Sequence, residues 1–317
     1  CRLRSGTSVY QYIIRRLLLT VPVVIGVSII VFGIIRLLPG DPARALAGVN
    51  ATPQYIEQVR EKYGLDEPVY VQYWNFISQL VQGDLGTSTF SRRPVTTELG
   101  ERFPRTLLLA GVSLFIATVV GVSAGIVSAT RRNSVFDNAS MFVALVGVAA
   151  PVFWLALMLQ LLFAVQLRVL PATGIGSIRH LILPSITLGM ASAALMARIT
   201  RSSVLDVLRQ DFITTARAKG LAERTVIYKH ALKNALIPVV TVLGLQFGIL
   251  LGGAVLTETV FAWPGVGRLL VDAILRRDYP VVQGTVMLLA FLFVIINLVV
   301  DVIYAFLDPR IHYQRHD

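Results

Sequence analysis

The sequence is almost without cysteine and contains few charged residues. Cys1 is the only cysteine among 317 residues, so no disulfide can form within the chain. Charged residues make up only 15% of the chain, hydrophobic residues make up 55%, and the mean hydropathy is +0.70. An ordinary soluble domain is more charged and less apolar. The composition therefore argues against a soluble globular protein.

Motifs for nucleotide, metal or nucleophilic chemistry are also missing. No G-x-x-x-x-G-K-[ST], H-E-x-x-H or C-x-x-C motif occurs. The histidines show no metal-ligand spacing within an apolar run, so we expect this chain to hold no metal or cofactor; they are His180, His230, His312 and His316. Asp301 is the only carboxylate within a predicted span, and we favour a structural role for it over ion coupling. A membrane-embedded enzyme and a self-sufficient channel or carrier are therefore disfavoured.

The sequence does contain apolar runs long enough to cross a bilayer, which takes about 20 residues in a helix. We predict an all-α polytopic membrane protein with six transmembrane helices. The predicted spans are about 13–38, 106–130, 141–165, 181–197, 235–256 and 284–307. Among short segments, Lys and Arg favour one side, so we expect both termini to be cytoplasmic. This orientation and contact with lipid headgroups explain the net charge of +11 without nucleic-acid binding.

The spans divide the chain into three parts. Residues 1–38 form the tail and first span, 39–104 an extracytoplasmic insert, and 105–317 a core with five spans. Within the insert, Thr52-Pro53 and Asp66-Glu67-Pro68 predict two helix starts, with Gly64 and Gly83 as the corresponding stops. The aromatic residues of the insert could either pack at the membrane edge or recognise the substrate. We favour packing at the membrane edge. These aromatic residues are Tyr63, Tyr70, Tyr73 and Trp74.

Small residues recur at helical spacing in two spans. Gly121 and Gly125 have the small-xxx-small spacing that lets helix backbones approach closely. Gly244, Gly248 and Gly252 repeat every four residues in the fifth predicted span. We favour tight helix packing for this second set, and the wall of a permeation pathway is the alternative.

The polar stretch 211–238 lies between two apolar runs and is strongly cationic. Gly220 separates two short pieces that we expect to be helical. Membrane spans hold both ends of this stretch, and the chain shows no energy source of its own. We therefore interpret it as the surface through which a partner outside the membrane moves the spans. The expected docking face consists of the small residues Thr214, Thr215, Ala216 and Ala218.

This stretch resembles the cytoplasmic coupling loop of binding-protein-dependent ABC importer permeases, whose general motif is E-A-A-x3-G-x9-I-x-L-P. Ala216, Gly220 and Leu232 match that motif, whereas Thr214 stands where it has Glu. The segments T-A-R-A-K-G-L (215–221) and H-A-L-K-N-A (230–235) are similar to the peptide-permease branch. Further similar segments follow in order: L-P-G-D-P-A (38–43), Y-G-L-D-E-P (63–68), G-D-L-G-T-S (83–88), R-I-T-R-S-S (198–203), 257–267 and R-D-Y-P-V-V-Q-G (277–284). Together they resemble the B-type permease of dipeptide and oligopeptide ABC importers.

The resemblance implies a type I ABC importer permease in the bacterial inner (plasma) membrane. It implies a heterodimer with a C-type sister permease, two cytoplasmic ATPase subunits that bind ATP and Mg²⁺, and an extracytoplasmic substrate-binding protein or lipoprotein. The chain would be a transport subunit rather than an enzyme, with a peptide as cargo; nickel chelates, haem and glutathione are alternatives. The coupling loop would be 201–234, and its ATPase-coupling residues would be Thr214, Thr215, Ala216, Arg217, Ala218, Lys219, Gly220 and Leu221.

The segment 257–283 is amphipathic and is broken at Trp263-Pro264-Gly265, a pattern typical of a re-entrant or interfacial element. We expect it to form the outer gate and, with the insert, to contact the binding protein. The candidate residues are Trp74, Glu258, Phe261, Trp263, Pro264, Gly265, Arg277 and Asp278.

Overall fold

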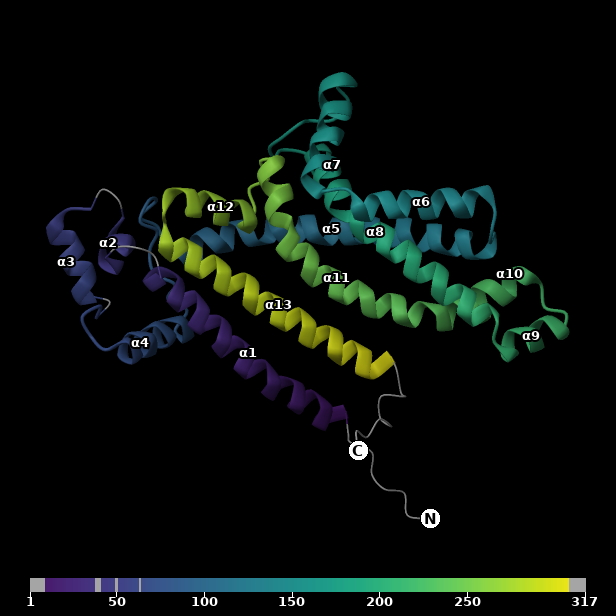
Figure 1. The fold of residues 1–317 in the computed structure, drawn as a ribbon, viewed down its shortest axis with the longest axis horizontal. Coiled ribbons are helices and arrows are strands. Elements are labelled where there is room, and N and C mark those ends of the chain that lie inside the picture. Colours follow the sequence, from purple (N-terminus) through teal and green to yellow (C-terminus); the bar gives the residue numbers. More distant parts are fainter. Residues whose placement is uncertain (1–8, 38–40, 49–50, 63, 308–317) are drawn as a thin grey trace, which may run out of the picture.

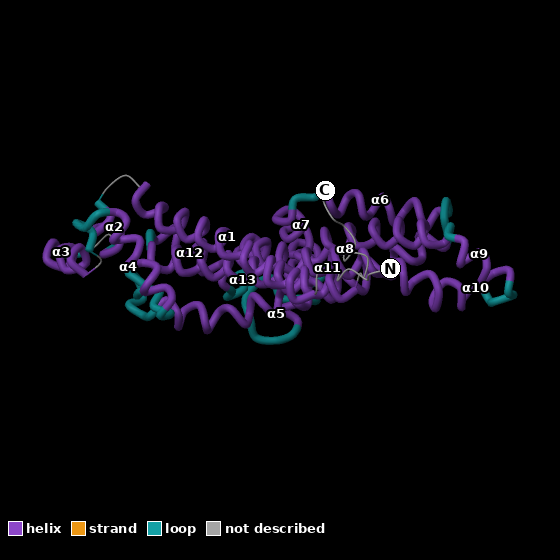
Figure 2. Tube along the Cα trace, turned by 90° about the horizontal axis from the view of Figure 1, so that it is seen from below, coloured by secondary structure: helices purple, strands orange, loops and turns teal. Residues whose placement is uncertain are grey.

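The computed structural model describes residues 9–37, 41–48, 51–62 and 64–307, and most of these residues are helical (Figure 2). The helices are α1 (Val9–Leu37), α2 (Pro42–Ala47), α3 (Pro53–Lys62), α4 (Val69–Val81), α5 (Val95–Thr130), α6 (Val135–Ala149), α7 (Val152–Leu159), α8 (Arg179–Leu208), α9 (Asp211–Ala218), α10 (Glu223–Thr225), α11 (Leu232–Val260), α12 (Val266–Arg276) and α13 (Tyr279–Leu307). Two π-helical turns, η1 (Gln160–Gln166) and η2 (Val226–Ala231), continue α7 and precede α11. Cys1 and Tyr63 lie outside the described residues, as does the side chain of Asp301.

The long helices pack in the order α5, α8, α11, α13 and α1 (Figure 1). The insert helices α2, α3 and α4 lie at one end of the molecule, and α9 and α10 lie at the opposite end in both views (Figures 1 and 2). This separation is what a membrane protein needs if the insert and the coupling loop face opposite sides of the bilayer.

Within the described residues, four helical segments are long and apolar enough to cross a membrane. They are Val95–Thr130, Arg179–Leu208, Glu223–Gly252 and Tyr279–Val300. The bent pair of α6 with α7 and η1 makes a fifth if it counts as one span, and α1 adds the shorter apolar stretch Leu18–Gly33. The all-α polytopic fold is confirmed, and the number of six spans stays a prediction.

The predicted third span is not one helix. The helices α6 and α7 with η1 are bent by 109° at their junction. Pro151 causes the break, because proline has no backbone N–H and disfavours helical geometry at the residue before it. Ala150 is accordingly extended, with φ −70° and ψ 129°. The predicted third span is therefore two helices that meet at a sharp bend, and their assignment to a single membrane crossing stays a prediction.

The helix α5 begins at Val95, well before the predicted start of the second span at residue 106. Its first turns carry Glu98, Glu101 and Arg102, which hydropathy alone assigns to the insert. Pro104 lies inside the helix. The expected boundary between insert and core at residue 104 therefore falls within a helix.

The insert confirms both predicted helices. Thr52 Oγ1 accepts a hydrogen bond from Tyr55 N at 3.3 Å at the start of α3, and α4 follows Pro68 directly. Asp41, the N-cap residue of α2, accepts from Ala43 N at 3.0 Å and from the Arg60 guanidinium at 2.6 Å, which ties the start of α2 to α3. The charge of Asp41 is the largest cause of the raised pKa of Arg60.

The small residues of α5 confirm the close approach of two spans. A Cβ on Gly121 would lie 2.5 Å from the carbonyl oxygen of Ala193, and one on Gly125 would lie 2.6 Å from that of Ala197. Both carbonyls belong to α8, so α5 and α8 are in direct backbone contact there. Any larger residue would force these two helices apart.

The three glycines of α11 have different surroundings. A Cβ on Gly244 would lie 2.3 Å from Val300 on α13, and one on Gly248 would lie 3.4 Å from the ring of Phe293 on the same helix. Gly252 has no atom within 4 Å of its Cβ position. Tight packing therefore accounts for Gly244, and Gly252 is the position that leaves open space.

Candidate functional site

The predicted coupling loop is anchored on the core by two side chains of α9. Ile213 and Ala216, three residues apart on the same face of α9, are 0% and 7% exposed. They pack in one apolar cluster with residues at the end of α8, in η2 and at the start of α11. Burying a side chain such as Ile213 contributes about 1.5–3 kcal/mol, so α9 is a fixed part of the fold. Other members of this cluster are Val204, Val207, Val226, Ala231 and Leu232.

The opposite face of α9 and the turn after it are open to a partner. Seven of the eight predicted coupling residues are exposed: Thr214, Thr215, Arg217, Ala218, Lys219, Gly220 and Leu221. Ala216 is the exception, because its position three residues after Ile213 turns it toward the core. Of the four residues of the expected docking face, Thr214, Thr215 and Ala218 are therefore exposed and Ala216 is not.

Gly220 makes the turn that follows α9. Its φ is +74°, a left-handed conformation that glycine adopts without the steric cost of a side chain. Across this turn, Arg217 donates to Glu223 at 2.6 and 3.1 Å. This hydrogen bond raises the pKa of Arg217. Both side chains are about half exposed, so the pair shapes the turn but adds little stability.

An ion pair with a buried carboxylate joins α5, α6 and α8 at the start of the predicted coupling loop. Arg201 on α8 donates to both carboxylate oxygens of Asp137 on α6 at 2.7 and 2.8 Å. Ser128 Oγ on α5 donates to Asp137 as well, and Asn133 N donates at 2.9 Å. Asp137 is 1% exposed. We call these four residues the inner joint. The resemblance pointed to Arg201 within R-I-T-R-S-S, but no pattern in the sequence indicated Asp137 as its partner.

A second buried carboxylate organises the opposite end of the core. Glu258 on α11 is 0% exposed and accepts from Thr106 Oγ1 at 2.6 Å and from Arg268 N at 3.0 Å. The same Thr106 Oγ1 accepts from Val266 N at 2.8 Å. A Cβ on Gly265 would lie 2.0 Å from Glu258, so only glycine fits there. We call this set, which joins α5, α11 and the start of α12, the outer cluster.

The predicted break at Trp263-Pro264-Gly265 lies directly on the outer cluster. Trp263 and Phe261 are both 2% exposed. Trp263 Nε1 donates to the carbonyl oxygen of Arg105 at 3.1 Å, which fixes the break against α5. Glu258 and Trp263 therefore hold α5 and α11 together, whereas Phe261 packs against Ala156 of α7 and Leu183 of α8. All three side chains are too deeply buried for a binding protein to reach them in this conformation.

Asp278 is also buried and hydrogen-bonded within the protein. It is 3% exposed and accepts from Ser88 Oγ and from Thr89 N at 3.1 Å, in the hairpin before α5. The segments G-D-L-G-T-S and R-D-Y-P-V-V-Q-G are thus brought together by this carboxylate. Of the eight outer candidates, only Trp74 and Arg277 have exposed side chains.

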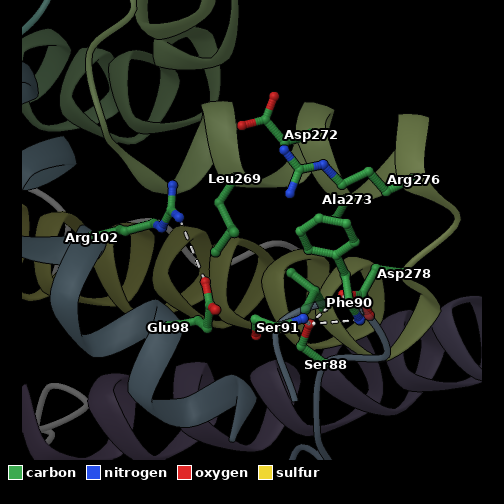
Figure 3. A pocket seen from close by; sticks show the side chains of 11 residues that line it. Ser88, Phe90, Ser91, Glu98, Arg102, Leu269, Asp272, Ala273, Arg276 and Asp278 are labelled. Atoms are coloured by element: carbon green, nitrogen blue, oxygen red, sulfur yellow. Dashed lines mark hydrogen bonds and ion pairs between the residues drawn. The ribbon is translucent and has the colours of Figure 1, made fainter. Parts of the chain in front are cut away.

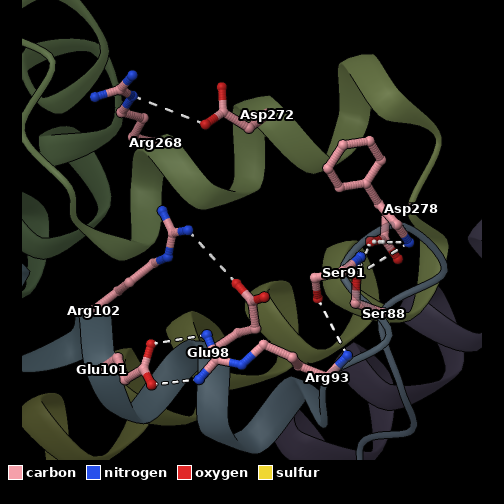
Figure 4. A network of polar contacts seen from close by, with 10 residues as sticks. Ser88, Ser91, Arg93, Glu98, Glu101, Arg102, Arg268, Asp272 and Asp278 are labelled. Atoms are coloured by element: carbon pink, nitrogen blue, oxygen red, sulfur yellow. Dashed lines mark hydrogen bonds and ion pairs between the residues drawn. The ribbon is translucent and has the colours of Figure 1, made fainter.

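A pocket of about 180 Å³ lies between this hairpin, α5 and α12 (Figure 3). Glu98 and Arg102 enter it from α5, and Asp272 and Arg276 from α12. Its charges are largely paired within the chain: Arg102 lies 3.6 Å from Glu98, and Asp272 lies 3.8 Å from Arg268 (Figure 4). The guanidinium of Arg276 lies 4.2 Å from the ring centre of Phe90.

We expect Glu258→Ala to lower the free energy of unfolding by about 2 kcal/mol, because Thr106 Oγ1 and Arg268 N lose their buried acceptor. The measurement is thermal unfolding of the purified protein in detergent. The control is Glu101→Ala, which removes an exposed carboxylate of α5 paired with Arg93 and should change the stability much less, because solvent screens exposed ion pairs. Equal losses in the two variants would contradict a special role for Glu258.

Comparison with known proteins gives a consistent result over nearly the whole chain. The family described as "Binding-protein-dependent transport system inner membrane component" matches residues 121–313, and its N-terminal companion matches residues 9–110. The glutathione transport system permease protein GsiC of Escherichia coli (strain K12) is 52% identical over 304 residues, covering 96% of this chain and 99% of its own length. The dipeptide transport system permease protein DppB of Alkalihalophilus pseudofirmus is 49% identical, with 95% and 99% covered.

Solved structures share the fold at lower sequence identity. The inward-facing MetNI methionine ABC transporter matches with a TM-score of 0.56 and 21% identity, over 66% of this chain and 96% of that one. An amino acid ABC transporter crystallised with histidines matches with a TM-score of 0.53 and 13% identity, over 66% and 94%. Over about two thirds of its length, the chain thus shares its fold with these ABC transporters.

Proposed function

Because this chain belongs to the family of binding-protein-dependent transport system inner membrane components, we propose that it forms half of the translocation pathway of an ATP-driven importer of short peptides. The chain is a membrane-embedded transport subunit and not an enzyme. The observation that supports the cargo is the near-full-length identity of about half of all residues to both a glutathione and a dipeptide permease. Glutathione is itself a short peptide, so the two relatives favour the same chemical class.

An ABC importer permease works with ATPase and substrate-binding partners. We further propose two ATPase subunits that bind ATP and Mg²⁺, a C-type sister permease as the other half of a heterodimer, and an extracytoplasmic binding protein or lipoprotein. Each ATPase site would lie outside this chain. Nickel chelates and haem remain alternative cargoes, because an apolar, glycine-containing pathway recognises little of what passes through it.

The coupling loop supports a mechanical role. Closure of the ATPase dimer would press on the exposed face of α9, and the buried contacts of Ile213 and Ala216 would pass that movement to α8 and α11. The spans would then change from inward- to outward-facing, with the outer cluster as the gate that must open. The binding protein would release its peptide into the cavity between the permeases, and hydrolysis would reset the cycle. Arg277 is the proposed exposed contact for the binding protein on the outside.

The test of the cargo is ligand-stimulated ATP hydrolysis by the intact importer in lipid, with its binding protein present. We expect glutathione or di- and oligopeptides to raise the rate, because a loaded binding protein favours the outward-facing state. Free amino acids serve as the control for size. Stimulation by a nickel chelate or haem, and not by any peptide, would overturn the peptide assignment.

A further inference from the structure

The helix α4 of the insert has an unusual distribution of side chains. It contains no charged residue, whereas the neighbouring α3 contains four, Glu57, Arg60, Glu61 and Lys62. Its most exposed side chains are Tyr70 at 75%, Trp74 at 70% and Val81 at 82%. These positions follow one another at i, i+4 and i+11, so they share one face of the helix.

The opposite face of α4 carries its polar contacts. Gln72 is 8% exposed, and its side-chain amide donates to the carbonyl oxygens of Leu65 and Glu67 at 2.9 and 2.7 Å. Tyr73 makes a hydrogen bond of 2.8 Å to Ser28 through its hydroxyl group. The helix thus turns Gln72, Tyr73 and Phe76 toward the rest of the protein. Its exposed face of Tyr70, Trp74 and Val81 is aromatic and aliphatic, and Asn75 is an exposed polar residue beside it. The exposed face of a helix surrounded by water usually carries charged and polar side chains.

The contacts of α4 with α1 fix its position relative to the membrane. The ring of Phe32 lies 5.2 Å from that of Tyr73 and 5.7 Å from that of Phe76. Ser28 and Phe32 belong to the apolar stretch Leu18–Gly33 of α1. At about 1.5 Å per residue, they lie roughly 8 and 2 Å inside the outer end of that stretch. Helices that lie in a membrane interface are buried to about 5–10 Å.

The neighbouring surface of α1 is also apolar. Ile25, Ile29 and Ile30 on α1 are 48%, 52% and 66% exposed. The helix α4 therefore packs against the apolar stretch of α1, which we predict to span the membrane, near the end of that stretch, where Trp and Tyr are enriched in membrane proteins. The absence of charged residues from α4, the orientation of its exposed face and its position along α1 all indicate that this face lies at the membrane interface.

We propose that α4 is an interfacial helix whose face of Tyr70, Trp74 and Val81 contacts the boundary between lipid headgroups and acyl chains. The occupant of this face is the outer leaflet of the bilayer and not a protein. The inference rests on the membrane location of the chain and is independent of its cargo. It removes Trp74 from the candidate contacts of the binding protein and leaves Arg277 as the exposed residue of that set.

Spin labels on single cysteines test the proposal in the assembled importer in lipid nanodiscs. Cys1→Ser removes the single cysteine of this sequence, and the other subunits must carry no reactive cysteine. The labelled variants are Trp74→Cys and Val81→Cys, with Gln58→Cys on the charged helix α3 as the aqueous reference and Ile30→Cys on α1 as the lipid reference. Collisions with oxygen, which concentrates in lipid, are compared with collisions with a nickel chelate, which stays in water.

We expect the oxygen-to-nickel collision ratio at positions 74 and 81 to rise well above that of Gln58→Cys and toward that of Ile30→Cys. A ratio equal to that of Gln58→Cys would place α4 in water and overturn the proposal. Low collision rates with both reagents would show that a protein subunit covers this face, and would overturn it as well. The two labelled positions are independent, so one variant that fails to assemble leaves the other as the test.

Discussion

Replacing Gly220 with tryptophan is expected to abolish substrate-stimulated ATP hydrolysis while the protein still inserts into the membrane. The φ of +74° at this position costs a residue with a side chain about 1–2 kcal/mol. No atom lies within 4 Å of the Cβ position, so the indole would project from the turn beside the exposed face of α9. It would displace an ATPase from that face without disturbing the core. The measurement is the hydrolysis rate of the assembled importer with and without loaded binding protein.

Gly83→Trp is the matched control for this variant. Gly83 has nearly the same φ, +78°, and also has no atom within 4 Å of its Cβ position, but it lies in the extracytoplasmic insert. The cost in backbone strain is therefore similar in both variants, and only Gly220→Trp should lose stimulation. Normal stimulated hydrolysis in Gly220→Trp would disprove the coupling role of this turn.

Arg201→Ala is expected to lower the free energy of unfolding by about 3 kcal/mol, because it leaves the buried carboxylate of Asp137 without its cation. Ser128 and Asn133 still donate to Asp137, but neither carries a charge. The inner joint also connects α5, α6 and α8, so coupling between hydrolysis and transport should fall in the same variant. Thermal unfolding in detergent measures the first effect, and the ratio of ATP hydrolysed to peptide imported measures the second.

The control for Arg201→Ala is Arg217→Ala. This variant breaks the ion pair between Arg217 and Glu223, whose side chains are 44% and 56% exposed. Exposed pairs contribute about 1 kcal/mol or less. A double variant, Asp137→Ala with Arg201→Ala, should recover part of the lost stability, because no unpaired charge then remains. If Arg201→Ala were no less stable than Arg217→Ala, the inner joint would not be a stabilising element.

The features that the sequence predicted best depend on local chemistry. Proline and N-terminal capping residues set the starts of α3 and α4, and a glycine with positive φ ends the coupling helix, so these positions could be read from neighbouring residues. The close approach of α5 and α8 also followed from glycine spacing. In contrast, the 109° bend at Pro151 was missed because hydropathy is continuous across it. Proline was visible there, but a single proline is also compatible with a kinked span.

The site residues that sequence reasoning missed depend on contacts between distant segments. Thr106 and Glu258 are 152 positions apart, and Ser128, Asp137 and Arg201 meet only when three helices pack. Ala216 matched the general coupling motif, yet its place one turn after Ile213 decides that it faces the core. Motifs therefore indicated a candidate coupling loop but could not say which side of its helix is exposed.

The helix α5 is long enough to hydrogen-bond both buried carboxylates, Asp137 and Glu258. Ser128 of the inner joint and Thr106 of the outer cluster are both α5 residues, and 22 positions correspond to roughly 33 Å along a helix. Between them, Gly121 and Gly125 press the backbone of α5 onto α8, with no layer of side chains that could yield. The helix α5 therefore connects the inner joint and the outer cluster rigidly. If it tilts at the cytoplasmic end, Thr106 shifts relative to Glu258 without any chain of side-chain rearrangements between the two ends.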